Sequence, residues 1–466
     1  MFKYPIIFLL LVAALPGCKK QDFISGPEAR LRISADSIRF DTVFTSTGSI
    51  TQFVRIFNEN DEKLLLNNIK LAGGASSPFK INVDGLQGPS VNNIELDAND
   101  STYLFVTVTI NPTATKLPFI VRDSISIEYN GNIKWIQLQA WGQNARFLRS
   151  KVVQANEVWT DSLPYVIIGD LTIAQNVTLT IQKGTRIFLH ADAPILVEGT
   201  LLVNGEQYDS TKVIFTGDRL DEPYRDFPAS WPGIYFRKTS KDNVMNFASI
   251  KNAYQGIVVE DPSNNANPKL VLFSCIVDNC YDAGLLAVKS DIKATNCLFS
   301  NSSKNIILIH GGKYDFTHCT DAAYSNEFIL HKDPVLFVSD FIKTGNVIST
   351  ANLQATFTNC IFWGDNGTVE TEIVTAKLGT GTFTVSFIHC LWKEKEPVAN
   401  ITKVNPVINE DPRFDSINIQ KRFFSFRLQP VSPAINKGVN TGVMTDLDGK
   451  LRPIGLPDLG SYEKNP

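Results

Sequence analysis

The sequence predicts an all-β protein made of a β-sandwich, a parallel β-solenoid and a C-terminal cap. Three observations carry this prediction: apolar and polar residues alternate over 31–146, residues 150–405 hold short strands without a helix-length segment, and cysteines recur at a fixed interval. The length of 466 residues requires more than one domain. A hydrophobic share of 43% and a charged share of 20% exclude a disordered or fibrous chain.

The N-terminus predicts an exported, lipid-anchored protein. Residues 6–15 are apolar, but this run is shorter than the roughly 20 residues that a membrane-spanning helix needs, so residues 1–17 are a predicted signal peptide. The run ends in Leu15-Pro16-Gly17-Cys18, which resembles a bacterial lipobox, with Pro16 in place of the usual small residue. The resemblance implies acylation of Cys18 (for example by palmitate), attachment to the bacterial outer membrane and a tether over 18–30. The alternative is an ordinary secretory signal with an incidental cysteine.

The region 31–146 predicts a sandwich of short, half-buried strands. Residues 52–57 and 103–110 alternate strictly, and turn residues such as Gly73-Gly74 and Asn130-Gly131 interrupt the strands. About seven strands in this length are typical of a sandwich. The order of these segments resembles Hydin-like immunoglobulin-type domains, and this resemblance implies a spacer or interaction module.

The solenoid prediction depends on a repeat. Cys275, Cys297 and Cys319 are 22 residues apart, about the length of one coil of a three-strand parallel solenoid. Equivalent residues of stacked coils form ladders, with one ladder pointing inward and another at a turn, where Asn tolerates the left-handed conformation. The inward ladder is Ala248, Cys275, Cys297 and Cys319, and the turn ladder is Asn252, Asn279 and Asn301.

These repeats resemble right-handed parallel β-helix proteins of the pectate-lyase-like class. Residues 213–234 are similar to the opening coils of Bacteroidetes β-helix lipoproteins, and residues 411–436 and 446–463 are similar to their closing segment and cap. The predicted fold is therefore an immunoglobulin-like sandwich over 31–146, a right-handed parallel β-helix over 150–405, and a closing segment and cap over 406–466. This resemblance implies a fold and a lineage, and it implies no particular activity.

The loop 217–231 is the densest cluster of polar and aromatic residues. Sugars are bound by aromatic faces and hydrogen-bonding side chains, so the loop is a candidate ligand site. The alternative, which the sequence favours, is a structural bulge that packs Trp231 onto the solenoid and pairs its own charges. The candidate residues are Asp218, Arg219, Asp221, Tyr224, Arg225, Asp226 and Trp231.

A lyase of this class would need acids at equivalent positions of adjacent coils. Asp278 instead has Ser300 as its equivalent and Lys251 before it, and Asp282, Asp291, Asp315 and Asp321 are expected to be solvated turn acids out of register. No residue is predicted with confidence to be catalytic.

Metal sites receive little support from the sequence. His318 and His389 precede ladder cysteines, but strand neighbours point to opposite faces, so surface histidines and core cysteines are expected. Asp446 and Asp448 resemble the start of a calcium loop, but a structural cap with Arg452 pairing the acids is favoured. No metal and no cofactor is predicted, with Ca²⁺ as the alternative.

The sequence favours a non-catalytic envelope protein whose partners are the membrane and a glycan or another envelope component. A polysaccharide lyase or glycoside hydrolase is the alternative, and a structural or adhesive surface protein is the second alternative. The net charge of −3 argues against nucleic acid as a partner, because the chain has no excess of basic residues. After Cys18, six cysteines remain, and they are expected to be buried thiols because stacked side chains point the same way.

Overall fold

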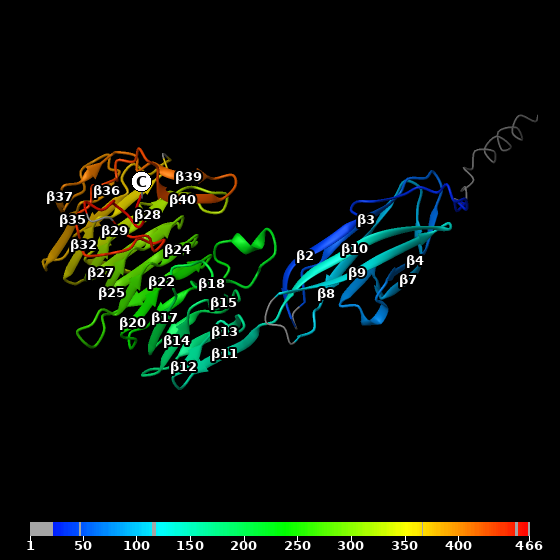
Figure 1. Ribbon diagram of the computed structural model, residues 1–466, viewed down its shortest axis with the longest axis horizontal. Coiled ribbons are helices and arrows are strands. Elements are labelled where there is room, and N and C mark those ends of the chain that lie inside the picture. Colours follow the sequence, from blue (N-terminus) through cyan, green and yellow to red (C-terminus); the bar gives the residue numbers. More distant parts are fainter. Residues whose placement is uncertain (1–21, 46–47, 114–117, 366, 453–454, 465–466) are drawn as a thin grey trace, which may run out of the picture. The chain divides into compact units, whose positions relative to one another are not determined.

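The computed structural model describes residues 22–45, 48–113, 118–365, 367–452 and 455–464 (Figure 1). The chain forms two compact units that are divided between Asn144 and Ala145. The predicted signal peptide and Cys18 lie outside the described residues. In the described ranges, no helix is both long enough and apolar enough to cross a membrane.

The protein is all-β, as the sequence predicts. The described residues contain no α-helix and only two short 3₁₀ helices, η1 (Gly74–Ser76) and η2 (Tyr224–Asp226). The strands form antiparallel sheets in the first unit and one 26-stranded parallel sheet in the second.

The first unit is a sandwich of two five-stranded sheets, with strand orders β1-β3-β8-β5-β6 and β2-β10-β9-β4-β7. All pairs are antiparallel except β2 with β10, which is parallel. The sequence predicts about seven strands, fewer than the structure has. The strands β1 and β6 have three residues each, which is too few for an alternating pattern to be recognised in the sequence. The strands are β1 (Leu31–Ile33), β2 (Ser37–Phe44), β3 (Gln52–Asn58), β4 (Leu64–Leu71), β5 (Phe79–Val83), β6 (Leu86–Gly88), β7 (Ser90–Leu96), β8 (Ser101–Val108), β9 (Phe119–Tyr129) and β10 (Asn132–Gln143).

The second unit is a parallel β-helix. Its strands stack in chain order (Figure 1), and each pairs in parallel with the equivalent strand of the next coil. The strands are β11 (Arg146–Val153), β12 (Glu157–Trp159), β13 (Tyr165–Ile173), β14 (Thr178–Gln182), β15 (Arg186–Leu189), β16 (Ile195–Val197), β17 (Thr200–Asn204), β18 (Val213–Gly217), β19 (Ile234–Phe236), β20 (Asn243–Asn246), β21 (Ala248–Lys251), β22 (Gln255–Glu260), β23 (Leu270–Phe273), β24 (Ile276–Asp278), β25 (Ala283–Thr295), β26 (Leu298–Ser300), β27 (Lys304–Thr317), β28 (Thr320–Ala323), β29 (Leu336–Ser339), β32 (Leu353–Thr358), β33 (Ile361–Gly364), β34 (Ile373–Ala376), β35 (Phe383–Ile388), β36 (Leu391–Trp392), β37 (Thr402–Val404) and β38 (Val407–Ile408).

The pairings divide these strands into three faces. Face A holds β12, β14, β17, β20, β23, β32, β35 and β37, face B holds β15, β18, β21, β24, β26, β28, β33, β36 and β38, and face C holds β16, β19, β22, β29 and β34. The strands β11 and β13 contribute to both face B and face C. The long strands β25 and β27 contribute to both face C and face A. Two hairpins lie outside the coils, β30 (Phe341–Thr344) with β31 (Val347–Thr350) and β39 (Phe414–Asn418) with β40 (Phe423–Leu428).

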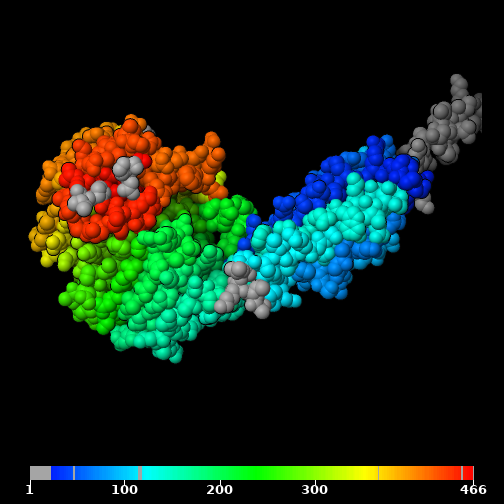
Figure 2. All heavy atoms as spheres, viewed as in Figure 1, coloured from blue at the N-terminus to red at the C-terminus, as the bar shows by residue number. Residues whose placement is uncertain are grey.

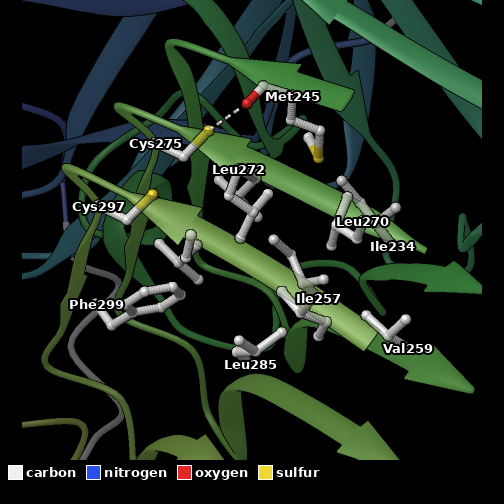
Figure 3. Packing of buried hydrophobic residues seen from close by; sticks show 14 of the residues in the cluster. Ile234, Met245, Ile257, Val259, Leu270, Leu272, Cys275, Leu285, Cys297 and Phe299 are labelled. Carbon is white, nitrogen blue, oxygen red and sulfur yellow. Dashed lines mark hydrogen bonds between the residues drawn. The ribbon is translucent and has the colours of Figure 1, made fainter. Parts of the chain in front are cut away.

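The interior of the solenoid is a continuous apolar core. Ala248 and all six cysteines after Cys18 are buried, and none of these six forms a disulfide. Figure 3 shows Cys275 and Cys297 on successive coils beside Leu272 and Phe299. Rings also stack from coil to coil, as for Phe357 and Phe387, whose centroids are 4.8 Å apart. Burial raises the pKa of the Cys280 thiol to about 12, so these cysteines behave as small apolar residues.

The C-terminal part covers the outer side of face B, where it spreads over the surface of the second unit in orange to red (Figure 2). Outward-facing residues of face B and residues of the C-terminal part form a separate apolar core. Its buried members include Leu298, Ala322, Ile361, Trp363 and Leu391 from face B, and Phe414, Phe426, Leu428, Ala434, Leu447, Leu459 and Tyr462 from the C-terminal part.

We call residues 437–452 and 455–464 the clasp. The clasp runs back along the corner between faces A and B, where each coil from β21 to β38 places one left-handed residue before its face B strand. The Lys437 carbonyl lies 2.7 Å from His389 Nδ1, and the Thr445 carbonyl accepts from Asn296 Nδ2 at 2.6 Å. The predicted cap therefore lies along the side of the stack and crosses several coils.

Candidate functional site

The loop 217–231 packs its aromatic anchor inward. Trp231 is 1% exposed, and its indole N–H donates to the Lys251 carbonyl at 2.8 Å. The inclusion of Trp231 among the ligand-facing residues is therefore wrong, because no face of its ring is accessible. Tyr224 is exposed, but the Arg219 guanidinium lies 4.1 Å from the centroid of its ring.

The charged residues of this loop are paired within the protein. Arg219 donates two hydrogen bonds of 2.8 Å to Asp221. Arg225 lies 2.6 Å from Glu222, and Asp218 Oδ2 lies 2.7 Å from His190 Nδ1. This is the self-paired bulge that the sequence favours. A ligand-binding role for Asp218, Arg219, Asp221, Tyr224, Arg225 and Asp226 stays a prediction.

The loop is fastened to the corner between faces B and C. Asn252, Asn279 and Asn301 occupy this corner in successive coils, with φ angles of 63°, 57° and 51°. Asn252 donates to the Arg225 carbonyl at 2.8 Å, and Asn279 donates to the Asp226 carbonyl at 2.9 Å. Asn279 also donates to Asn252 Oδ1 at 2.8 Å, whereas Asn301 donates to Asp278.

Two exposed tyrosines follow this corner, and sequence reasoning missed them. Tyr254 and Tyr281 are 45% and 52% exposed, and their rings stack with centroids 5.8 Å apart. The signal was present in the repeat: Asn252-Ala253-Tyr254 and Asn279-Cys280-Tyr281 are followed, one coil on, by Asn301-Ser302-Ser303. Backbone bonds from Tyr281 to Ala253 and from Ser303 to Cys280 place these three segments in register.

The tyrosine stack therefore stops at Ser303. A ring at that position would stack on the second face of Tyr281, whereas the serine has no ring, and Tyr281 is 52% exposed. We call this place the tyrosine notch, and its residues are Tyr254, Tyr281, Asp282, Ser303 and Lys304. Lys304 Nζ lies 3.5 Å from Asp282 Oδ1, and Gln255 donates to Asp282 Oδ2 at 2.8 Å. The notch combines an aromatic face with an acid, a base and a hydroxyl.

Tyr235 of face C lies close to this cluster. Burial raises the pKa of its hydroxyl, and the charges of Tyr254 and Asp282 act in the same direction. Its hydroxyl donates to the Pro232 carbonyl at 3.2 Å.

On face B, the acid Asp278 lies between a lysine and a serine at the equivalent positions of the neighbouring coils. Asp278 pairs with Lys251 on one side and with Ser300 on the other, as the sequence predicts. The Lys251 ammonium lies 3.7 Å from Asp278, and the Ser300 hydroxyl donates to Asp278 at 2.7 Å.

The expectation that Asp321 is a solvated turn acid is wrong. Asp321 is fully buried in β28, where Asn305 donates to it at 2.6 Å. Burial raises its pKa well above the ordinary value. Asp291 and Asp315 lie in β25 and β27, and only Asp282 occupies a turn.

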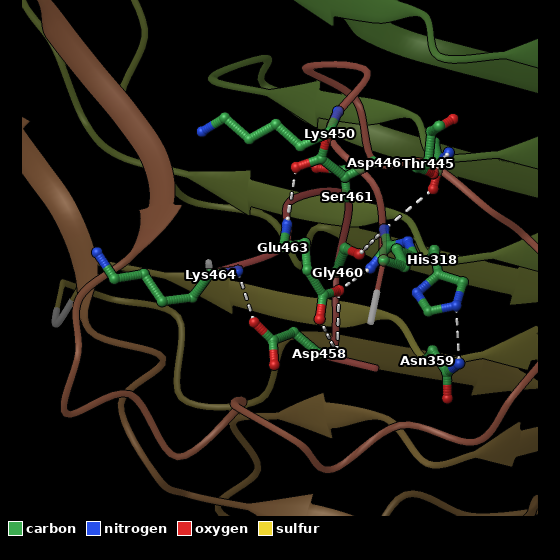
Figure 4. A network of polar contacts seen from close by, with 12 residues as sticks. His318, Asn359, Thr445, Asp446, Lys450, Asp458, Gly460, Ser461, Glu463 and Lys464 are labelled. Atoms are coloured by element: carbon green, nitrogen blue, oxygen red, sulfur yellow. Dashed lines mark hydrogen bonds and ion pairs between the residues drawn. The ribbon is translucent and has the colours of Figure 1, made fainter. Parts of the chain in front are cut away.

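The expected surface position of His318 is also wrong. Its side chain leaves the interior on the opposite side from Cys319, but the clasp covers it completely (Figure 4). Nε2 lies 3.0 Å from Asn359 Nδ2 and 3.1 Å from the Thr441 hydroxyl. Burial lowers the pKa of His318 to about 3, and the neighbouring Arg452 acts in the same direction. Among the described residues, no group of three or more His, Cys, Asp or Glu could hold a metal ion.

The acids of the cap have partners other than those expected. Arg452 pairs with Glu463 at 2.6 Å, and both side chains are buried; the expected pairing of Arg452 with Asp446 and Asp448 is therefore wrong. Asp446 accepts backbone N–H groups from Lys450 and Glu463. Asp448 accepts two hydrogen bonds of 2.7 Å from Arg427. A calcium ion at this loop would have to displace these contacts.

A family model described as a right-handed β-helix region matches residues 168–321, about a third of the chain. This match supplies the handedness of the solenoid. The right-handed β-helix fold is shared by polysaccharide-degrading enzymes and surface proteins. None of the curated proteins matches the chain.

Similar solved structures are distant. The catalytic unit of an α-1,3-glucanase from Streptomyces thermodiastaticus is 10% identical over 76% of this chain and 87% of its own, with a TM-score of 0.24. A family 123 glycoside hydrolase from Clostridium perfringens is 10% identical over 26% of this chain, with a TM-score of 0.19, and the match spans 30% of that enzyme. A PapD-like domain of human CEP192 is 11% identical over 26% of this chain and 89% of its own, with a TM-score of 0.18. At these identities and scores, none of the three carries an argument about function.

Proposed function

We propose that this protein is a lipid-anchored component of the bacterial outer membrane that binds a glycan at the tyrosine notch of its β-helix. The observation that carries the proposal is the exposed ring of Tyr281 at the end of the tyrosine stack, with the Asp282–Lys304 pair on the adjoining residues. The anchor is proposed from the lipobox resemblance that ends at Cys18. We also assign the sandwich to the immunoglobulin-type domains, as a spacer or interaction module.

The notch suits a sugar ring for a geometric reason. Coils of a solenoid repeat at about 4.8 Å, close to the separation of stacked rings. Tyr254 and Tyr281 fill two successive positions of this stack, with centroids 5.8 Å apart, and Ser303 leaves the third position open. A sugar ring placed there stacks its C–H face on Tyr281.

Polar groups at the notch supply hydrogen bonds for sugar hydroxyls. Asp282 accepts and the Lys304 ammonium donates, and both remain partly exposed, with side-chain exposures of 29% and 41%. The Ser303 hydroxyl is able to do both. Aromatic faces that are combined with a few placed polar groups are typical of ligand sites.

The register of face B favours binding without catalysis. Asp278 stands between Lys251 and Ser300, so adjacent coils do not repeat an acid at this position. A lyase of this fold class would require clustered acids for a metal ion. The alternatives of a polysaccharide lyase or glycoside hydrolase, and of an adhesive protein without a small ligand, are outcomes of the test.

The test is a printed glycan array probed with the full chain and with the variant Tyr281→Ala. Loss of one stacked aromatic is expected to weaken binding roughly tenfold. Tyr208→Ala is the matched control, because Tyr208 is 65% exposed on the same unit and lies outside the notch. Unchanged binding by Tyr281→Ala would contradict the notch proposal.

Two further measurements address the rest of the proposal. Release of unsaturated products, read by ultraviolet absorbance, would make the protein a lyase instead of a binder. Mass spectrometry of the native N-terminus is expected to find acylated Cys18, and a Cys18→Ser variant is expected to leave the membrane fraction. A bare, unmodified Cys18 would contradict the anchor.

A further inference from the structure

We propose that the sandwich carries a second, separate binding site, and that its ligand is an acidic saccharide. The site lies on the outer face of the sheet β1-β3-β8-β5-β6, beside a groove of about 650 Å³. It shares no residue with the tyrosine notch, so it goes beyond the proposed function and does not rest on it.

An aromatic cluster forms one side of this site. Phe53, Tyr103 and Phe105 are 55%, 40% and 39% exposed, although apolar side chains of this size are ordinarily buried. Tyr103 and Phe105 stack with an interplanar angle of 12° and centroids 5.7 Å apart. Phe53 packs edge-on against both rings.

The stack ends at the groove. Positions 103, 105 and 107 of β8 share one face of the sheet, and the third of them is Thr107. Both Phe105 and Thr107 line the groove, so the ring of Phe105 that stacks on Tyr103 also meets the groove. The aromatic row ends at a hydroxyl-bearing residue, as it does at Ser303 of the notch.

The groove lining identifies the class of ligand. The polar side chains at the groove include Thr51, Asn82, Gln87 and Thr107, which offer hydroxyl and amide groups. Lys80 alone is charged among the described residues that line the groove, and it pairs across the sheet with Thr107. Lys80 has no carboxylate partner in the described part of the chain.

The groove offers one ammonium group without a carboxylate partner, an aromatic face and several neutral hydrogen-bonding groups. Together these groups are complementary to a sugar ring that carries a carboxylate. The volume lies within the range of small-ligand sites, which is about 300–1,000 Å³. An acidic saccharide satisfies the lysine, the amides and the aromatic face together. A peptide or a second copy of the chain is an outcome that would overturn the proposal.

The test uses the full chain on an array of uronate- and sialate-containing oligosaccharides printed beside their carboxyl-reduced counterparts. The expected result is binding to an acidic glycan that falls about tenfold on carboxyl reduction, and about tenfold in each of Lys80→Met and Phe105→Ala. Lys80 is exposed, so its replacement leaves the fold intact.

Two control variants distinguish this site from the other exposed aromatic surfaces of the chain. Trp135→Ala removes an aromatic side chain that is 48% exposed on the other sheet, and it is expected to leave this binding unchanged. Tyr281→Ala is also expected to leave it unchanged, which distinguishes failure of this site from failure of the notch. Three results would each overturn the proposal. They are equal binding of acidic and carboxyl-reduced glycans, wild-type binding by Phe105→Ala, and a concentration-dependent dimerisation of the wild type that Phe105→Ala abolishes.

Discussion

At the residue scale, the corners of the solenoid depend on residues that accept a left-handed backbone. The sequence predicted this for Asn252, Asn279 and Asn301, because Asn tolerates that conformation. The corner between faces A and B shows the limit of this reasoning. Phe247 is left-handed there, with a φ angle of 47°, although a bulky residue such as Phe does not predict it. His318, with a φ of 53°, is a residue type that accepts this conformation more readily. Their conformation follows from the stacking of neighbouring coils.

Glycine is required where coils approach closely. A Cβ on Gly256 would lie 2.6 Å from the Gly284 carbonyl oxygen and 2.9 Å from Cys280 Sγ. Gly256→Ala is therefore expected to lower the free energy of unfolding of the solenoid by about 1–3 kcal/mol or more. Chemical denaturation measures the loss. The control is Gly455→Ala in the same unit, where a Cβ meets no atom within 4 Å; equal stability of the two variants would contradict the packing argument.

His318 makes the stability of the clasp depend on pH. Its pKa falls from an ordinary value of about 6.5 to about 3 on folding, so the unfolded chain binds more protons between these values. The stability that neutral His318 contributes is complete above about pH 6.5, and it is lost as the pH falls toward 3. Glu463 has the opposite effect on the pH dependence of stability. Burial, followed by the charge of Asp458, raises its pKa to about 7, so the stability it contributes is lost as the pH rises toward 7.

The difference between two proteins isolates the histidine. Relative to His318→Gln, wild type is expected to lose stability progressively as the pH is lowered from 6.5 to 4, with Glu463 common to both proteins. Denaturant unfolding at several pH values measures this difference. A difference that stays constant with pH would show that His318 is not held neutral.

At the element scale, face B differs from the other faces because it is covered on both sides. The signal was visible in the sequence: Ile361-Phe362-Trp363 and Leu391-Trp392 are apolar at both inward and outward positions. The covering element was harder to predict. Asn359 meets Val439 across 80 residues, and no local pattern fixes a contact of that separation.

Asn359 is expected to hold the clasp in place. Its amide donates to the Val439 carbonyl at 2.7 Å and accepts from the Val439 N–H at 2.9 Å. Asn359→Ala is expected to destabilise the clasp by about 2–3 kcal/mol, since each hydrogen bond contributes about 1 kcal/mol and the left-handed backbone disfavours alanine. Hydrogen exchange of the clasp measures this opening.

The control for the backbone cost is Asn400→Ala. Asn400 is exposed and has a φ of 55°, almost that of Asn359 at 56°. Faster exchange of the clasp in Asn359→Ala alone is the expected outcome. The same exchange rate in both variants would show that the side-chain bonds of Asn359 do not hold the clasp.

At the scale of the whole molecule, periodicity predicted the all-β class and the solenoid, because stacking repeats the same environment in every coil. The candidate site was less predictable. The loop 217–231 has a composition typical of a sugar site, but its charges pair with one another, as for Arg219 with Asp221. The notch lies where the residue at one repeated position changes from tyrosine (Tyr281) to serine (Ser303). This change can be recognised as the end of a tyrosine stack only after the coils have been aligned with one another.

The buried cysteines predict a thiol count for the exported chain. All six are 2% exposed or less and free, so a thiol reagent is expected to leave these six unmodified in the folded protein. Six thiols are expected to react after denaturation if Cys18 is acylated, and seven if it is bare. Five thiols with a bare Cys18, or four with an acylated Cys18, would reveal a disulfide and contradict the ladder of free thiols.

The most direct test of the central claim fills the notch instead of emptying it. Ser303→Tyr adds a third ring next to Tyr281, at the next position of the stack of Tyr254 and Tyr281. Glycan binding by the full chain is the measurement. Ser303→Tyr is expected to keep wild-type stability and to abolish binding at the notch. A stable Ser303→Tyr variant that binds the glycan as tightly as wild type would contradict the notch proposal.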